Sequence, residues 1–241
     1  MKDIMDLHTH TVASGHAYNT LYEMVQAAAG AGLSLFGSSD HAPGLPGCCT
    51  EMYFMNFKVL PKELFGVRLL MGSEVNILDY QGSVDLRPRI LEKLDYAIAS
   101  IHPPCFRCGT VSQNTAAYIK AMENPYIHII GHPDDGRFPV DYDALAAAAA
   151  RHHVLLEVNS SSLSPHSSRQ GARANYQAML ERCVHYGTSV LLSSDAHAAP
   201  DAGNHREALR LLEEVRFPED LVVNTSLEKL ARFLPVLQEA L

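Results

Sequence analysis

Three histidines stand close together near the start of the chain, in the segment Asp6-Leu-His8-Thr-His10-Thr-Val-Ala-Ser-Gly-His16. In an extended strand alternate side chains share a face, so Asp6, His8 and His10 project to one side. Two imidazoles placed in this way can bind the same transition metal, because such metals favour nitrogen ligands. His16 follows a short loop and lies within reach of a second metal. A lone His-x-His is more often a solvated surface pair, so further ligands must support the prediction.

The same arrangement recurs along the chain: a short apolar run, typical of a buried strand, ends at polar residues. The seven runs are Ile4–Leu7, Leu33–Ser39, Val67–Ser73, Tyr96–Ile101, Tyr126–Gly131, Val154–Val158 and Ser189–Ser194. They are followed, in chain order, by His8 and His10, Asp40 and His41, Glu74, His102, His132, Asn159, and Asp195 with His197. Sites in parallel α/β folds are built at the carboxyl ends of the strands, so we expect these side chains at one mouth.

Helical patterns separate many of the runs, which indicates βα units and a parallel sheet. We predict helices over 20–31, 58–65, 142–153, 170–186, 204–215 and 227–241, the first capped by Thr20 and ended by Gly32. The Pro- and Gly-rich stretch 42–50 is predicted to be a loop. No linker interrupts this pattern, so residues 1–241 are expected to form a single barrel-like domain of the α/β class.

Taken together, seven histidines and two carboxylates are candidate metal ligands: His8, His10, His16, His41, Glu74, His102, His132, Asp195 and His197. Nine ligands exceed what one tetrahedral metal can use, which indicates two or three metals with a carboxylate bridging between them. Metals about 3.5–4 Å apart share a hydroxide, lower its pKa and clamp the oxygens of a phosphoryl group. The sequence therefore predicts metal-dependent hydrolysis, with phosphate esters as the leading substrates.

The composition restricts the partners and the location. The net charge of -8 argues against a nucleic-acid surface and against docking on anionic membranes. No basic N-terminal segment precedes an apolar run, and no run approaches membrane-spanning length, so we expect neither a signal peptide nor a membrane span. Five cysteines, an odd number, then favour a reducing cytoplasm.

At this point the chain resembles the PHP (polymerase and histidinol phosphatase) family over nearly its full length, and within it the small stand-alone phosphatases of the YcdX type. The resemblance rests on the His8/His10/His16 segment and on Ser39-Asp40-His41, Gly72-Ser-Glu74-Val-Asn76, His102-Pro, Gly131-His132-Pro133, Leu156-Glu-Val-Asn159 and Ser194-Asp195-Ala-His197. It implies a distorted (β/α)7 barrel of TIM-like PHP fold, with a trinuclear metal site at the carboxyl-terminal mouth of the strands. It also allows a homo-oligomer.

The resemblance further implies how the ligands are shared among the metals. One metal would bind His8, His10, Glu74 and Asp195; a second Glu74, His102 and His132; and a third His16, His41 and His197. The mixed nitrogen and oxygen ligands favour zinc and also admit manganese or iron.

A metal-bridging hydroxide is the predicted nucleophile on a small phosphorylated metabolite, with Glu74 and Asp195 holding the metals. Asp6 and Asp40 are predicted to orient ligating imidazoles. Arg169 and His166, in the loop after the sixth run, are predicted to contact the phosphate and the leaving group, because Arg binds phosphate with two parallel hydrogen bonds.

The residues alone leave three other functions open. A phosphodiesterase or nuclease would act on nucleotides or short oligonucleotides, although the acidic balance disfavours a long nucleic acid. An amidohydrolase would normally have a carbamylated lysine where this chain has His102. A metal-binding scaffold without activity would be expected to lack some of the ligands.

The remaining thiols, imidazoles and amides have simpler interpretations. Cys105-x-x-Cys108 and the pair Cys48-Cys49 are expected to be loop thiols, and Cys183 to be buried in packing. His128 is predicted to be structural. The histidines predicted to be solvated are His152, His153, His185 and His205. Asn224-Thr-Ser matches a glycosylation acceptor but is expected to have no consequence without an export route.

Overall fold

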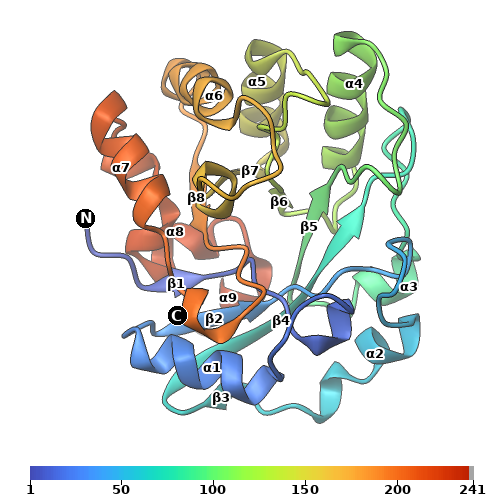
Figure 1. The fold of residues 1–241 in the computed structure, drawn as a ribbon, viewed down its shortest axis with the longest axis vertical. Helices are drawn as coiled ribbons and strands as arrows, with labels where there is room; N and C mark the ends of the chain where they lie inside the picture. The colour runs from blue at the N-terminus through green and yellow to red at the C-terminus, as the bar shows by residue number, and fades with distance from the viewer. Residues whose placement is uncertain (239–241) are drawn as a thin grey trace.

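The computed structural model describes residues 1–238, which form a nearly closed barrel of seven parallel strands with helices around it (Figure 1). The strands follow the order β1-β2-β4-β5-β6-β7-β8, and the short β3 pairs antiparallel with β4. Their bounds are β1 Met5–Asp6, β2 Leu35–Ser38, β3 Glu63–Leu64, β4 Val67–Asn76, β5 Tyr96–Ser100, β6 Ile129–Ile130, β7 Leu155–Asn159 and β8 Val190–Ser193. The barrel fold and all seven parallel strands are thus as predicted from the sequence, with small shifts at their ends.

Figure 1 shows α4, α5 and α6 next to one another on one side of the barrel and α1 on the opposite side. The helices are α1 Leu21–Gly30, α2 Glu51–Met55, α3 Pro88–Leu91, α4 Val111–Met122, α5 Tyr142–His152, α6 Ala172–Tyr186, α7 Arg206–Val215, α8 Leu227–Ala231 and α9 Pro235–Gln238. Thr20 caps α1 as predicted, in a capping box with Glu23. Within residues 1–238 no helix is long and apolar enough to cross a membrane.

Side chains alternate in direction along each strand, which creates one apolar layer inside the barrel and another between the strands and the helices. On β5, Tyr96 and Ile98 point into the barrel, whereas Ala97 and Ala99 pack outward against the helices. Tyr96 fills the barrel interior and donates a hydrogen bond from its hydroxyl to the Leu7 carbonyl at 2.5 Å. Gly37 on the facing strand makes room for it, since a Cβ there would lie 2.4 Å from the Tyr96 hydroxyl. The apolar interior therefore supports the polar mouth from below.

Asn224 closes the gap between the first and last strands. Its buried side chain accepts a hydrogen bond from the Leu192 amide at 2.7 Å and donates to the carbonyls of Leu192 and Met5 at 2.9 and 3.2 Å. These bonds substitute for a strand ladder between β1 and β8. Asn224, for which the sequence indicated no consequence, is therefore a structural residue of the barrel.

Two predicted helices are wrong. Residues 58–65 do not form the predicted helix beyond the short 3-10 turn Phe57–Val59, because Pro61 interrupts the segment and Phe65-Gly66 form a turn with positive φ values into the β3–β4 hairpin. The helix predicted over 227–241 is divided into α8 and α9 by Pro235, and its last three residues lie outside the described part of the chain. The prediction also omitted α2, α3 and α4, although Thr110 and Gln113 form a capping box that marks the start of α4.

Candidate metal centre

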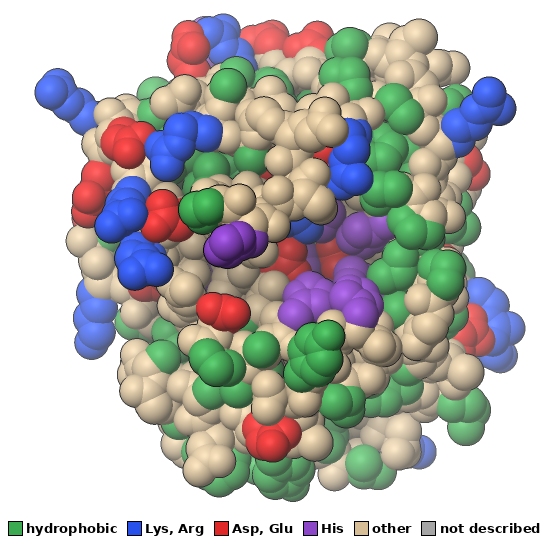
Figure 2. Space-filling view, viewed as in Figure 1, with side chains coloured by type: hydrophobic (Ala, Val, Ile, Leu, Met, Phe, Trp, Pro, Cys, Tyr) green, Lys and Arg blue, Asp and Glu red, His purple; other side chains and the backbone are tan. Residues whose placement is uncertain are grey.

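The carboxyl-terminal ends of the strands bring all nine predicted ligands into one cluster. Figure 2 shows histidine side chains gathered around a hollow in the molecule, with acidic side chains deeper inside it. Four groups of three have ligand atoms within 4.8 Å of one another: His10, His41 and His197; His8, His132 and Asp195; His8, His10 and Glu74; and His41, Glu74 and His102. His16 joins them through His197, with the two Nε2 atoms 3.0 Å apart.

Glu74 lies at the centre of this cluster. β4 continues past the predicted end to Asn76 because it pairs with both β2 and β5, so Glu74 lies within the strand and not after it. Its carboxylate reaches five imidazoles: one oxygen lies 2.8 Å from His132 and 3.2 Å from His102, and the other 2.8, 3.3 and 3.5 Å from His41, His8 and His10. Burial would raise the pKa of Glu74, but these imidazoles hold it well below its usual value.

Asp195 provides the second carboxylate, from the segment after β8. One oxygen lies 3.2 Å from His10 Nε2 and 3.6 Å from His8 Nε2, and the other accepts hydrogen bonds from Asn159 and Arg169 at 3.0 Å each. Asp195 has φ 54°, in the left-handed region that few residues other than glycine adopt. Such a backbone conformation persists only where the surroundings fix it, and it is common at functional sites.

Five of the seven imidazoles have Nδ1 bonded to an acceptor that is not a candidate ligand atom, which leaves Nε2 directed inward. The acceptors are Glu157 Oε1 for His8 (2.6 Å), Ser14 Oγ for His10 (3.1 Å), the Ser14 carbonyl for His16 (2.9 Å), Asn76 Oδ1 for His102 (2.7 Å) and the Asp195 carbonyl for His197 (3.0 Å). This fixes the tautomer and ring orientation, as outer partners do for histidines that bind metal.

Several inward-facing atoms have no hydrogen-bond partner although they are buried. They are His8 Nε2, His10 Nε2, His41 Nδ1 and Glu74 Oε2. Buried polar atoms without a partner are costly, and each of these four is of a type that can bind a divalent cation. The facing lone pairs of His16 and His197 would likewise repel unless a proton or a cation lies between them. The residues present therefore fit a group of bound metal ions.

Glu157 is an important residue that the sequence analysis missed. It is fully buried on β7 and accepts hydrogen bonds from His8 Nδ1 at 2.6 Å and from the His132 amide at 2.5 Å. Burial lowers the pKa of His8, but Glu157 and the nearby carboxylates raise it well above the usual value. The alternation of β7, with Leu155 inward and Leu156 outward, was the available signal that Glu157 faces the mouth.

The two predicted orienting aspartates act differently. Asp40 accepts hydrogen bonds from Thr11, Tyr53 and Ser14, and Ser14 in turn accepts one from His10 Nδ1, so Asp40 acts on that imidazole through Ser14. The prediction for Asp6 is wrong: within residues 1–238 its carboxylate contacts no candidate ligand's imidazole. It instead accepts hydrogen bonds from the backbone amides of His8, Ser194 and Gly203 and from the Ser194 hydroxyl, and so fixes the chain beside Asp195.

His205 is buried and not solvated as predicted. Its Nδ1 bonds to Asp3, and its Nε2 lies 3.4 Å from an Asp6 oxygen. Burial opposes the charge on His205, but the two aspartates raise its pKa to about 10. The reason for the error is tertiary: α7 places His205 against the first strand, which sequence spacing alone does not reveal.

Arg169 and His166 have different positions. Arg169 lines a cavity of about 370 Å³ that opens on the cluster, together with Pro103, Pro104 and several candidate ligands. It donates to Asp195 at 3.0 Å and to Ser162 at 2.8 Å, and its pKa is raised by the carboxylates around it against the opposing effect of burial. His166 is exposed and does not line this cavity, so its predicted contact with the leaving group has no support in the geometry.

The remaining thiols and imidazoles are largely as expected. All five cysteines are free, and Cys183 is buried as predicted. His128 accepts a hydrogen bond from the Ala97 amide at 3.3 Å, and burial lowers its pKa to about 4, which agrees with a structural role.

Comparison with known proteins adds a family match and close relatives. The PHP domain family model matches residues 6–161. The chain is 40% identical to a protein named probable phosphatase from Clostridium novyi, over 97% of this chain and 95% of that protein. It is 42% identical to one of the same name from Caldanaerobacter subterraneus, over 96% and 91%. A structure of histidinol phosphate phosphatase from Lactococcus lactis, complexed with zinc, L-histidinol and phosphate, matches with a TM-score of 0.61 at 16% identity, over 90% of this chain and 95% of that one.

Proposed function

The chain belongs to the PHP domain family and is a hydrolase of the phosphatase class, and we propose that it is a phosphomonoesterase that uses three divalent metal ions to hydrolyse a small phosphorylated metabolite. The observation that carries this proposal is the set of five imidazoles whose Nδ1 atoms are bonded to acceptors other than candidate ligand atoms. Imidazoles held in this way present their Nε2 lone pairs to the interior, as ligation requires.

The three ions would share the nine ligands as the family resemblance implies. His8, His10, Glu74 and Asp195 would hold one ion, Glu74, His102 and His132 another, and His16, His41 and His197 the third. The close spacing of Glu74 to imidazoles of all three groups supports its role as a bridge. Zinc is the first candidate, since the Lactococcus lactis phosphatase was solved with zinc; manganese and iron accept the same ligand types.

When bound, the ions would lower the pKa of a shared water and neutralise the phosphate oxygens. The protein's own part is to hold the reactants. Glu157, Ser14 and Asn76 fix the imidazoles, and Glu74 and Asp195 provide buried negative charge that draws cations into the mouth. Arg169 extends a guanidinium into the same cavity, where it would bind a phosphate oxygen while keeping Asp195 oriented.

The proposal also covers the cellular location, the excluded substrates and the oligomeric state. The five free thiols fit a cytoplasmic location, and the net charge of -8 disfavours long nucleic acids as substrates. A homo-oligomer remains a prediction.

The test is to measure bound metal and turnover in the same preparations. We expect Glu74→Ala and His102→Ala to lower metal content and hydrolysis of an aryl phosphate monoester together, because each removes a ligand. His185→Ala, a change at an exposed histidine on α6, is the matched control and should alter neither. A ligand variant with full turnover at unchanged metal content would remove that residue from the site. A preference for diesters over monoesters would replace the proposal with a phosphodiesterase.

A further inference from the structure

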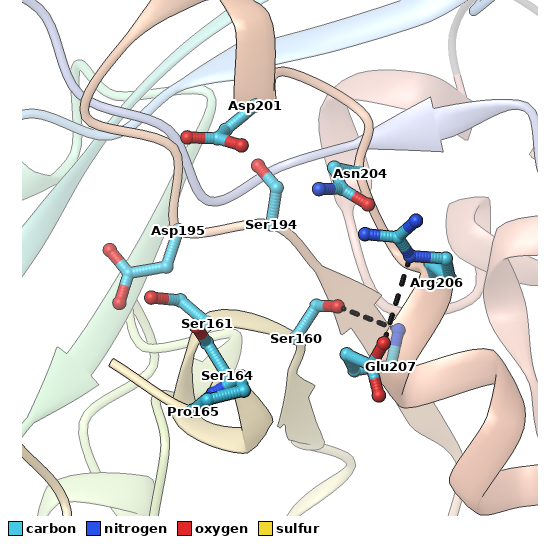
Figure 3. Close-up of a pocket in the computed structure, with 10 residues that line it drawn as sticks. All are labelled: Ser160, Ser161, Ser164, Pro165, Ser194, Asp195, Asp201, Asn204, Arg206 and Glu207. Carbon is cyan, nitrogen blue, oxygen red and sulfur yellow. Dashed lines mark hydrogen bonds and ion pairs between the residues drawn. The ribbon is translucent and has the colours of Figure 1, made fainter. Parts of the chain in front are cut away.

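A second cavity of about 180 Å³ lies beside the candidate metal centre, at the ends of β7 and β8 (Figure 3). Asp195 lines both this cavity and the one that contains the cluster. The second cavity is therefore adjacent to the position where a phosphate would be held. An ester bound at the metals needs space for its alcohol part. This cavity provides such a space, beside the segment that follows β8.

Every residue that lines this cavity except Pro165 has a polar side chain, although apolar carbon atoms also form part of the wall. Figure 3 shows Asp201 and Asn204 on one side and the hydroxyls of Ser161 and Ser164 on the other. The side chains of Asp201 and Asn204 make no hydrogen bond or ion pair with the other residues drawn there. The cavity thus presents polar groups that are available to a ligand.

The available groups include both acceptors and donors. Asp201 offers carboxylate oxygens, which need donors, and Asn204 offers N–H groups, which need acceptors, as well as an amide oxygen, whereas Arg206 and Glu207 pair with each other. A phosphate has only acceptors for the Asp201 carboxylate, and an ammonium has only donors for the Asn204 N–H groups. Hydroxyl groups both donate and accept, so they alone among these three groups satisfy both Asp201 and Asn204.

We propose that this cavity is a subsite for the alcohol part of the substrate and that it takes a polyhydroxylated group, as in the phosphate ester of a sugar or sugar alcohol. The proposal rests on the proposed phosphomonoesterase function. Asp201 and Asn204 are its specificity-determining residues, because their side chains face the cavity without partners in its lining. Asp195 connects the subsite to the reaction, and neither Asp201 nor Asn204 belongs to the candidate metal ligands.

The experiment compares six-carbon phosphate esters that differ only in their substituents. D-glucitol 6-phosphate carries hydroxyls, n-hexyl phosphate none, 6-aminohexyl phosphate an ammonium, and hexane-1,6-diol bisphosphate a second phosphate. The metal-loaded wild-type chain should have the highest kcat/KM with D-glucitol 6-phosphate. Asn204→Ala and Asp201→Ala should each lower that value by about tenfold, the size of one or two lost hydrogen bonds, and change n-hexyl phosphate turnover less than about twofold.

The control variant is Asn56→Ala, which also changes an asparagine but lies at the end of α2, outside this cavity. Equal losses with D-glucitol and n-hexyl esters in the Asn204 and Asp201 variants would overturn the subsite, since they would indicate a general structural effect. A wild-type preference for the hexyl, aminohexyl or bisphosphate ester would overturn it as well. Absence of metal-dependent turnover of every ester would refute the proposed function itself and the subsite with it.

Discussion

Replacing Glu157 by glutamine tests how the protein prepares its histidines for metal. The carboxylate is fully buried and accepts hydrogen bonds from His8 Nδ1 at 2.6 Å and from the His132 amide at 2.5 Å. A glutamine side chain would keep the shape, remove the negative charge and present an N–H group to at least one donor. Loss of such an outer partner typically costs about 10–100-fold in metal affinity or activity. That range corresponds to about 1.4–2.8 kcal/mol.

The assay is competition for zinc against a chromophoric chelator, followed by turnover of an aryl phosphate at saturating zinc. We expect Glu157→Gln to bind at least one ion about 10–100-fold more weakly. Glu214→Gln, which removes an equal charge from an exposed pair with Arg173, should bind zinc as the wild type does. Wild-type zinc affinity and turnover in a folded Glu157→Gln protein would refute the argument that Glu157 orients His8.

Three further predictions concern phosphate binding, pH and closure of the barrel. Arg169→Ala should raise KM for a phosphate monoester about tenfold with metal content intact, because a charged hydrogen bond is lost; an unchanged KM in steady-state kinetics would exclude a phosphate contact. His205, whose pKa is raised to about 10, should contribute stability that is fully present below about pH 6.5 and lost as the pH rises to about 10. Urea unfolding should therefore show a stability gap between wild type and His205→Ala that narrows over this range, and a constant gap would contradict the assignment. Asn224→Ala removes three buried hydrogen bonds and should lower the free energy of unfolding by about 2–4 kcal/mol, measured in the same way; a loss below about 0.5 kcal/mol would show that Asn224 does not close the barrel.

The sequence was sufficient to predict the barrel fold and to predict that the candidate ligands lie together at one mouth of the barrel. Apolar runs that end at polar residues indicate strand ends, and parallel strands place those ends together, so His102 and His132 could be assigned to the same mouth from sequence alone. Glu74 was assigned correctly to the mouth, although the pairing of β4 with two neighbours extends the strand beyond it.

The outer partners were harder to predict because tertiary contacts choose them. Glu157 is an inward residue between apolar neighbours, and its role depends on His8, which lies 149 positions away in the chain. From the sequence His205 is interpreted as a solvated residue at a helix end. Its contact with Asp3, which lies near the other end of the chain, becomes visible only in the structure. Asp6 shares the face of His8 by strand alternation, yet its oxygens are taken by Ser194 and Gly203. Local pattern predicts which side a residue faces, but not which partner it finds there.

The most direct test of the central claim is elemental analysis of the purified, metal-reconstituted protein, combined with turnover of an aryl phosphate monoester. Nine ligands around one mouth predict two to three divalent ions per chain, together with monoester hydrolysis that stops when the ions are removed and returns when they are restored. Fewer than one ion per chain after reconstitution, with no hydrolysis, would contradict the metal-dependent phosphomonoesterase.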